Sequence, residues 1–293
     1  MKTLLGKAVL VTLTLAVLLS AVACSGGQAQ PTATPPKPST GTAATPAPAA
    51  AAKATQAPTA PAQPQTQAKD AQSRISESAN LLLLSDKAVL KSYHIEASGT
   101  EPRWDQQTKK AAADTYSVKA DVSGQDLYLV YTSQSGDKPA TTTEGYMING
   151  GIGGQNGKDY VMTDGKPKES FGAISMAWAL FPLRVVMPLA FAAMGPTAQG
   201  SEAIDGRQAD KFAVDTANAP TGAMGVLGGL MTITSAKGTV WVDKQTGALL
   251  KCVLDYEQNF VDPPGSTTVA GSGKGHVELL VTKVGNVTVK LPQ

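Results

Sequence analysis

Cysteine, histidine and aromatic residues are scarce in this sequence. Its 293 residues include 2 cysteines and 2 histidines, and Phe, Trp and Tyr together make up 5%. Two cysteines, Cys24 and Cys252, cannot build the disulfide framework typical of small exported domains. The histidines, His94 and His276, are far apart in the sequence and do not form the ligand clusters that hold zinc. We therefore expect no metal site and no cofactor.

Sequence motifs for catalysis are missing as well. No serine is flanked by the glycines of a Gly-x-Ser-x-Gly elbow. His94 alternates with Glu96 on the polar side of a predicted strand, which favours a solvated imidazole over a general base. The glycine-rich stretches Gly150–Gly157 and Gly271–Gly275 lack the spacing of nucleotide-binding loops, so we interpret both as hairpin connections. The sequence thus predicts no catalytic residue and a protein that is not an enzyme.

Charge of either sign is sparse and evenly spread. The chain has 25 Lys and Arg against 23 Asp and Glu, for a formal net charge of +2. No basic stripe or acidic block stands out, so we expect no nucleic-acid partner.

The N-terminus has the layout of a secretory signal. Lys2 and Lys7 precede an uncharged apolar run from Ala8 to Val22, which is too short for a good membrane span. The run Ala21-Val22-Ala23-Cys24 resembles a lipobox, although a larger aliphatic residue usually stands where Ala21 is. We expect residues 1–23 to be removed and Cys24 to carry a lipid that anchors the chain to the extracytoplasmic face of a membrane. The alternative is an ordinary signal peptide with an incidental cysteine.

The next segment, residues 24–69, is composed almost wholly of Ala, Pro, Thr and Gln. It holds too few large apolar side chains to offset the entropy of ordering it. Its prolines favour extended conformations, so we interpret it as a semi-stiff disordered tether. The remaining residues, 70–293, are enough for one domain with a sizeable core.

This domain is predicted to be a helix followed by antiparallel hairpins. Apolar residues recur at helical spacing over Ala71–Lys91, and later segments alternate as strands do. In one of them Cys252 shares a face with Leu250 and Leu254, which predicts a buried thiol. Short strands separated by turn signals favour one antiparallel sheet, sandwich or barrel. The predicted strands are Ser92–Glu101, Asp114–Val122, Asp126–Ser133, Thr141–Asn149, Lys158–Thr163, Gly200–Ile204, Gln208–Val214, Gly238–Asp243, Ala248–Gln258 and Gly275–Val284.

Two apolar insertions interrupt the strands. We interpret Phe171–Met194 as two or three short helical pieces with kinks at Pro182 and Pro188, and Ala219–Leu230 as a second, helical excursion. The first insertion has three interpretations: a membrane span, ordinary core, or a lid over an acyl cavity. Arg184 and the prolines argue against the span, and sequence alone leaves the other two open.

Three segments resemble the LolA/LprG-like bacterial envelope lipoproteins: Ser92–Glu96, Gly200–Phe212 and Gly238–Lys251. The resemblance implies a mainly β (α+β) fold, in which a strongly curved antiparallel sheet forms a half-barrel and helical insertions cover its concave face. It also implies an apolar cavity for acyl chains between sheet and helices, and it supplies no catalytic residue.

From these observations we expect a lipoprotein that binds a lipid or lipidated molecule, for transport or retention in the cell envelope. The alternative is a protein-interaction or sensor domain on the same scaffold with a fully packed core. Apolar residues of the two insertions are the candidate cavity lining. They are Phe171, Ile174, Met176, Trp178, Phe181, Met187, Phe191, Met224, Leu227 and Leu230.

Overall fold

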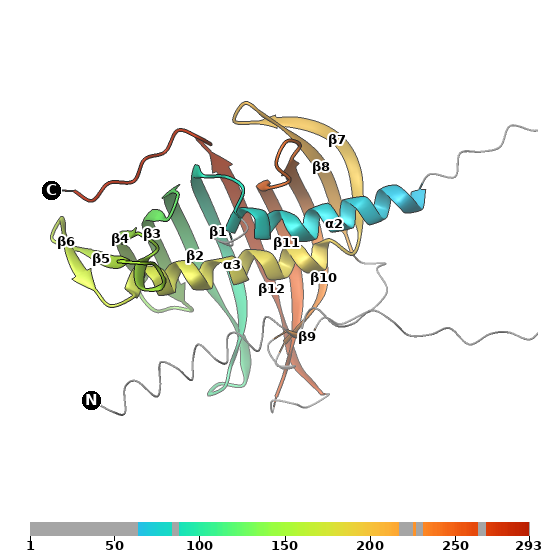
Figure 1. Cartoon of the computed structure of the whole chain (residues 1–293). Coiled ribbons are helices and arrows are strands. Elements are labelled where there is room, and N and C mark those ends of the chain that lie inside the picture. The colour runs from blue at the N-terminus through green and yellow to red at the C-terminus, as the bar shows by residue number, and fades with distance from the viewer. Residues whose placement is uncertain (1–63, 84–87, 217–224, 227–230, 263–267, 293) are drawn as a thin grey trace, which may run out of the picture. The chain divides into compact units, whose positions relative to one another are not determined.

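One antiparallel sheet of 12 strands dominates the computed structural model, which describes residues 64–83, 88–216, 225–226, 231–262 and 268–292 (Figure 1). The strands follow one another mostly as hairpins, because turn residues separate short alternating segments. Their bounds are β1 Ser92–Asp105, β2 Lys110–Ser123, β3 Asp126–Ser135, β4 Thr141–Ile148, β5 Lys158–Thr163, β6 Lys166–Ser170, β7 Pro196–Ile204, β8 Arg207–Asp215, β9 Gly225–Val226, β10 Met231–Asp243, β11 Leu249–Val261 and β12 Val269–Thr282.

The sheet has two wings that meet where the first and last strands pair. The strand order is β6-β5-β4-β3-β2-β1-β12-β11-β10-β8-β7, with β9 paired to β10 off this path. The pairing of β1 with β12 aligns Ile95 with Val281 and Ala97 with Leu279, which places apolar residues on the same face. The sheet is not closed, since β6 and β7 do not pair with each other. The predicted mainly β, antiparallel half-barrel is confirmed.

Two helices cover one face of this sheet. Helix α2 (Pro64–Leu83) and helix α3 (Ala173–Ala192) lie side by side across the strands (Figure 1). Helix α2 buries Ile75, Ala79 and Leu82, which are spaced by four and three residues and so share one helical face. These side chains belong to one core cluster with the inward residues of both wings. The core therefore lies between the sheet and the two helices.

The structure corrects the prediction for the first insertion. Residues 173–192 form one continuous helix, although Pro182 and Pro188 lie inside it. A proline in a helix removes one backbone hydrogen bond. Here both prolines are buried, and packing against the sheet holds the helix together across them.

Helix α2 is also displaced from its predicted position. It spans Pro64–Leu83 instead of Ala71–Lys91, so its first residues come from the segment interpreted as tether. Proline is favoured in the first turn of a helix, because the N–H that it lacks has no partner there. The apolar positions still determine the buried face, as predicted.

Two further predictions need correction. Gly271–Gly275, interpreted as a hairpin connection, lies inside β12. In the second insertion Gly225 and Val226 form β9, which pairs with Met231 and Thr232 of β10 and is extended, not helical. The rest of that insertion lies outside the described residues. The Gly150–Gly157 connection between β4 and β5 is confirmed, and it contains a 3₁₀ turn, η2, at Gly151–Gly153.

Candidate functional site

Helix α3 is the centre of the candidate site, and a buried carboxylate fixes its start. Gly172 precedes the helix with φ of 74°, a left-handed conformation that glycine adopts easily. Asp159 of β5 is buried and accepts hydrogen bonds from the Ser175 backbone N–H (2.8 Å) and the Ser175 Oγ–H (2.6 Å). A negative charge at a helix N-terminus interacts favourably with the helix dipole. The strand thereby determines where α3 crosses the sheet.

The structure places the predicted lining residues of α3 in three environments. Ile174, Phe181 and Phe191 are buried in the core. Trp178 and Met187 are partly buried and pack against it, and the Trp178 and Phe181 rings lie 5.6 Å apart. Phe171 and Met176 are exposed. Met224, Leu227 and Leu230 lie outside the described residues, as does Cys24.

The buried and exposed residues of α3 thus lie on opposite sides of one helix. The buried side contacts strands from β5 in one wing to β10 in the other. Met176 lies on the side of α3 opposite the sheet, and Phe171, just before the helix, is exposed, so neither lines a cavity under the helix. By length and composition α3 could also cross a membrane, with 39% of its most apolar window buried. Here its inner side packs on the sheet.

Arg184 forms a polar cluster at the edge of α3 that the sequence analysis did not identify. Its guanidinium lies 4.8 Å from the centre of the Tyr116 ring and 5.6 Å from that of Tyr131, and its Nε is 3.3 Å from a Glu101 carboxylate oxygen. Cation–π contacts and an ion pair together stabilise a charge beside apolar surroundings. Burial raises the pKa of Tyr116, so its hydroxyl stays neutral. The sequence signal for this cluster was the single arginine in an apolar segment, because a charge there needs partners that stabilise it.

Aromatic rings cover a row of glycines in β12. A Cβ on Gly275 would lie 2.1 Å from the Tyr256 ring, and one on Gly273 would lie 2.5 Å from Pro102. A Cβ on Gly271 would meet the Trp104 ring at 2.7 Å. The inward positions of β12 thus change from glycine to Val277 and Leu279 along the strand. The sequence signal was the alternation of these glycines, which is a strand period.

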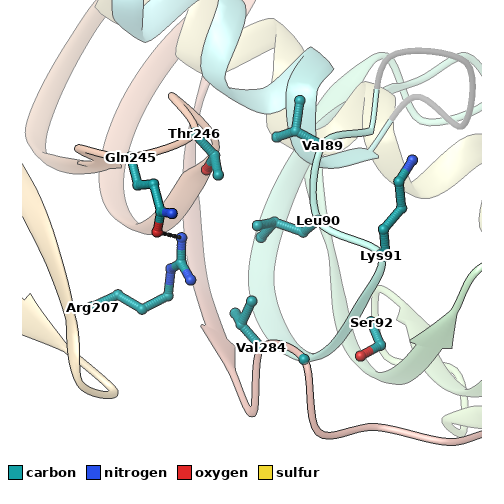
Figure 2. A pocket seen from close by; sticks show the side chains of 9 residues that line it. Val89, Leu90, Lys91, Ser92, Arg207, Gln245, Thr246 and Val284 are labelled. Atoms are coloured by element: carbon teal, nitrogen blue, oxygen red, sulfur yellow. Dashed lines mark hydrogen bonds between the residues drawn. The ribbon is translucent and has the colours of Figure 1, made fainter.

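A pocket of about 370 Å³ lies away from the predicted residues. Figure 2 shows Arg207 in it, with Nη2 at 3.4 Å from the Gln245 side-chain oxygen. The same Nη2 is 2.6 Å from the buried carboxylate of Asp243. Burial raises the pKa of Asp243, but the hydrogen bonds from Arg207 and Thr246 outweigh that effect and hold it below its usual value. The arginine is therefore already neutralised. The lining residues are Val89, Leu90, Lys91, Ser92, Arg207, Gln245, Thr246, Val284 and Gly285.

The histidines lie on the polar side of the sheet, where each is hydrogen-bonded to an aspartate of a neighbouring strand. His94 Nδ1 is 2.7 Å from Asp121, and His276 Nδ1 is 2.7 Å from Asp255. Within the described part of the chain no group of three or more His, Cys, Asp or Glu side chains could hold a metal ion.

The open antiparallel sheet with two helices across one face is the half-barrel fold that the resemblance implied. The chain is similar to the Mycobacterium tuberculosis lipoprotein LppX, with 17% identity, a TM-score of 0.35, and coverage of 76% of this chain and 99% of that one. It is also similar to a LolA superfamily protein from Nitrosomonas europaea, with 10% identity, a TM-score of 0.21, and coverage of 76% and 94%.

No protein-family model matches the sequence, and the search of curated proteins gives no match.

Proposed function

We propose that this chain is a membrane-anchored lipoprotein that binds a lipid or an acylated molecule between its sheet and helix α3, without catalysing a reaction. One observation carries the proposal. Helix α3 is apolar on both sides, and its inner side lies on the apolar face of a sheet that stays open at both edges. Hydrocarbon chains bind in apolar interiors of this kind, where a few polar groups at the rim set their orientation.

The composition of α3 supports a cover that adapts to its ligand. Met187 and Met194 pack against the core with unbranched, flexible side chains, which tolerate changes of shape. Pro182 and Pro188 each remove a backbone hydrogen bond, so the helix resists bending less than an unbroken one. At the rim, Arg184 supplies a polar group next to the tyrosine rings.

Uptake of a fluorescent fatty acid by the purified chain tests the proposal. We expect Ala177→Trp to abolish uptake, because Ala177 is partly buried and packs against the core, so the indole would occupy the acyl site. Ala179→Trp is the matched control, since Ala179 is exposed on the same helix and should leave uptake unchanged. Native mass spectrometry of the chain purified from its host should show copurified lipid. Absence of both uptake and copurified lipid from the unmodified chain would disprove the proposal.

The second candidate is a protein-interaction or sensor domain with a packed core. It is favoured by the burial of Ile174 and Phe181, which are 0% and 1% exposed. Under this alternative Ala177→Trp acts only by overpacking, which destabilises a dense core by about 1–3 kcal/mol. Loss of stability in that variant, together with no uptake by the unmodified chain, supports the second candidate.

A further inference from the structure

The outer face of α3 exposes a continuous apolar stripe. Met176, Leu180 and Leu183 are 54%, 51% and 44% exposed. Spacings of four and three residues place them on one side of the helix. Phe171, just before the helix, is 94% exposed, and Ile152, which lies beside Gly172, is 53% exposed.

Together with Phe171 and Ile152, this stripe contains most of the large apolar side chains that are exposed in the described part of the chain. Only two others are exposed there, Val89 in the connection before β1 and Val269 at the start of β12. No charged residue occurs between Ala173 and Leu183. The following residue, Arg184, is bound by Glu101 of β1 and by the rings of Tyr116 and Tyr131 on β2 and β3. Scattered exposed apolar residues are normal in proteins, whereas a concentrated apolar patch marks an interaction surface.

We propose that this face docks on the surface of a lipid bilayer, with α3 lying in the membrane plane. The inference rests on the proposed anchoring through Cys24. The chain from Cys24 to Pro64 can span at most about 145 Å, so a lipid on Cys24 keeps the domain within that distance of the membrane. Tethering raises the effective concentration of the bilayer, so the anchor adds to an apolar contact that also binds without it.

The geometry fits an interfacial helix. Helices of this kind bury their apolar side about 5–10 Å into the boundary between headgroups and acyl chains, and their affinity grows with the apolar area buried. An interfacial helix usually has a polar side that faces away from the lipid. In α3 that side packs on the sheet instead, through Ile174, Phe181 and Val185. The helix that covers the proposed ligand site then also contacts the membrane. An acyl chain can pass between bilayer and site along α3 without crossing water.

Vesicle flotation tests the docking. The probe is a vesicle of phosphatidylethanolamine and phosphatidylglycerol in equal parts, mixed with the non-acylated chain of residues 25–293, which keeps every described residue. We expect the unmodified chain to float, and Met176→Gln/Leu180→Gln/Leu183→Gln to lower the partition coefficient about tenfold or more, since each change removes apolar burial. Phe171→Ser is a second, independent variant. Val269→Gln is the matched control, because Val269 is equally exposed on β12 and should leave partitioning unchanged.

Three results would overturn the docking. The first is an unmodified chain that does not float. The second is partitioning that the stripe variants leave unchanged, or that high salt abolishes, because contact through an uncharged face is not screened. The third is a dimer in light scattering that the stripe variants dissociate, which would assign the face to a second copy. Fatty-acid uptake is measured on the same samples, so failed docking with retained uptake rejects this inference and leaves the proposed function standing.

Discussion

Single buried polar groups determine how α3 is placed on the sheet. Asp159 is 1% exposed, and both of its recorded hydrogen bonds come from Ser175. A buried carboxylate is tolerated only when its oxygens are hydrogen-bonded. The neighbouring Gly151 leaves no room for a side chain, since a Cβ there would lie 2.0 Å from Ser175 Oγ. Local packing of the β4–β5 connection and the start of α3 therefore depend on each other.

Asp159→Ala should lower the free energy of unfolding by about 1–3 kcal/mol, because the Ser175 donors lose their partner at a buried site. Urea denaturation followed by circular dichroism measures the change. Asp164→Asn on the same hairpin is the control, since Asp164 is exposed in a turn. Equal stability of the Asp159 variant and the control would show that the carboxylate does not hold the helix.

Cys252 shows how burial suppresses reactivity. It is 0% exposed, so its predicted burial is confirmed. Burial raises the pKa of the thiol to about 12, and the thiolate is the reactive form.

A polar disulfide reagent at pH near 8 should therefore label Cys252 only after unfolding. The native thiol has a higher pKa than the unfolded one, so its contribution to stability is present below the unfolded pKa and is lost as the pH rises above it. The absorbance of the thiolate, followed against pH with and without denaturant, measures the pKa of Cys252 in the unfolded and folded protein. Rapid labelling of the folded protein would show that the thiol is accessible.

At the scale of elements, β12 joins two different surfaces along one strand. Its first half presents glycines under Trp104, Phe260 and Tyr256, and its second half presents Val277 and Leu279 to the core. Glycine in a strand interior weakens it unless another group needs the space. Here the aromatic rings occupy the space and cover the backbone, an arrangement that supports curvature in a sheet.

Gly275→Ala should destabilise the fold by about 1–3 kcal/mol, because the added Cβ collides with the Tyr256 ring. Ser272→Ala on the exposed side of the same strand is the control and should be nearly neutral. Thermal unfolding of both variants gives the comparison. Restored stability in Gly275→Ala/Tyr256→Leu would identify the ring as the cause, whereas a stable Gly275→Ala would contradict the close packing.

At the scale of the whole molecule, the proposed function combines an anchor, a binding domain and a membrane-facing helix. A single acyl chain gives only marginal membrane binding, and the diacylglycerol expected on Cys24 supplies two chains. Contact through α3 adds to this anchor but does not replace it. The domain can then bind ligand while it stays at the membrane.

Cys24→Ala should therefore abolish incorporation of labelled fatty acid and move most of the protein out of the membrane fraction, or leave it as precursor. Fractionation and metabolic labelling of cells that make each form measure both effects. Ser25→Ala is the matched control, since it changes the next residue and keeps the cysteine. An acylated or fully membrane-bound Cys24→Ala protein would refute anchoring at this residue.

The sequence by itself determined most of the strands and the buried face of the first helix. Alternation around Cys252 predicted a buried thiol, and short strands separated by turn signals predicted one antiparallel sheet, sandwich or barrel. These features depend on neighbours in the chain, so local patterns report them. The glycines of β12 misled the prediction, because glycine is equally typical of turns and of strands crowded by another side chain.

Only the tertiary structure decided what depends on contacts between distant segments. It showed that α3 is one helix across Pro182 and Pro188, since packing on the sheet compensates for the lost hydrogen bonds. It paired Arg184 with Glu101 and placed Met176, Leu180 and Leu183 on the outer side of the helix. In a helix that is apolar all round, the sequence does not distinguish residues on the buried side from residues on the exposed side. Which side meets the sheet is determined by the strands that the helix crosses, and these lie far away in the sequence.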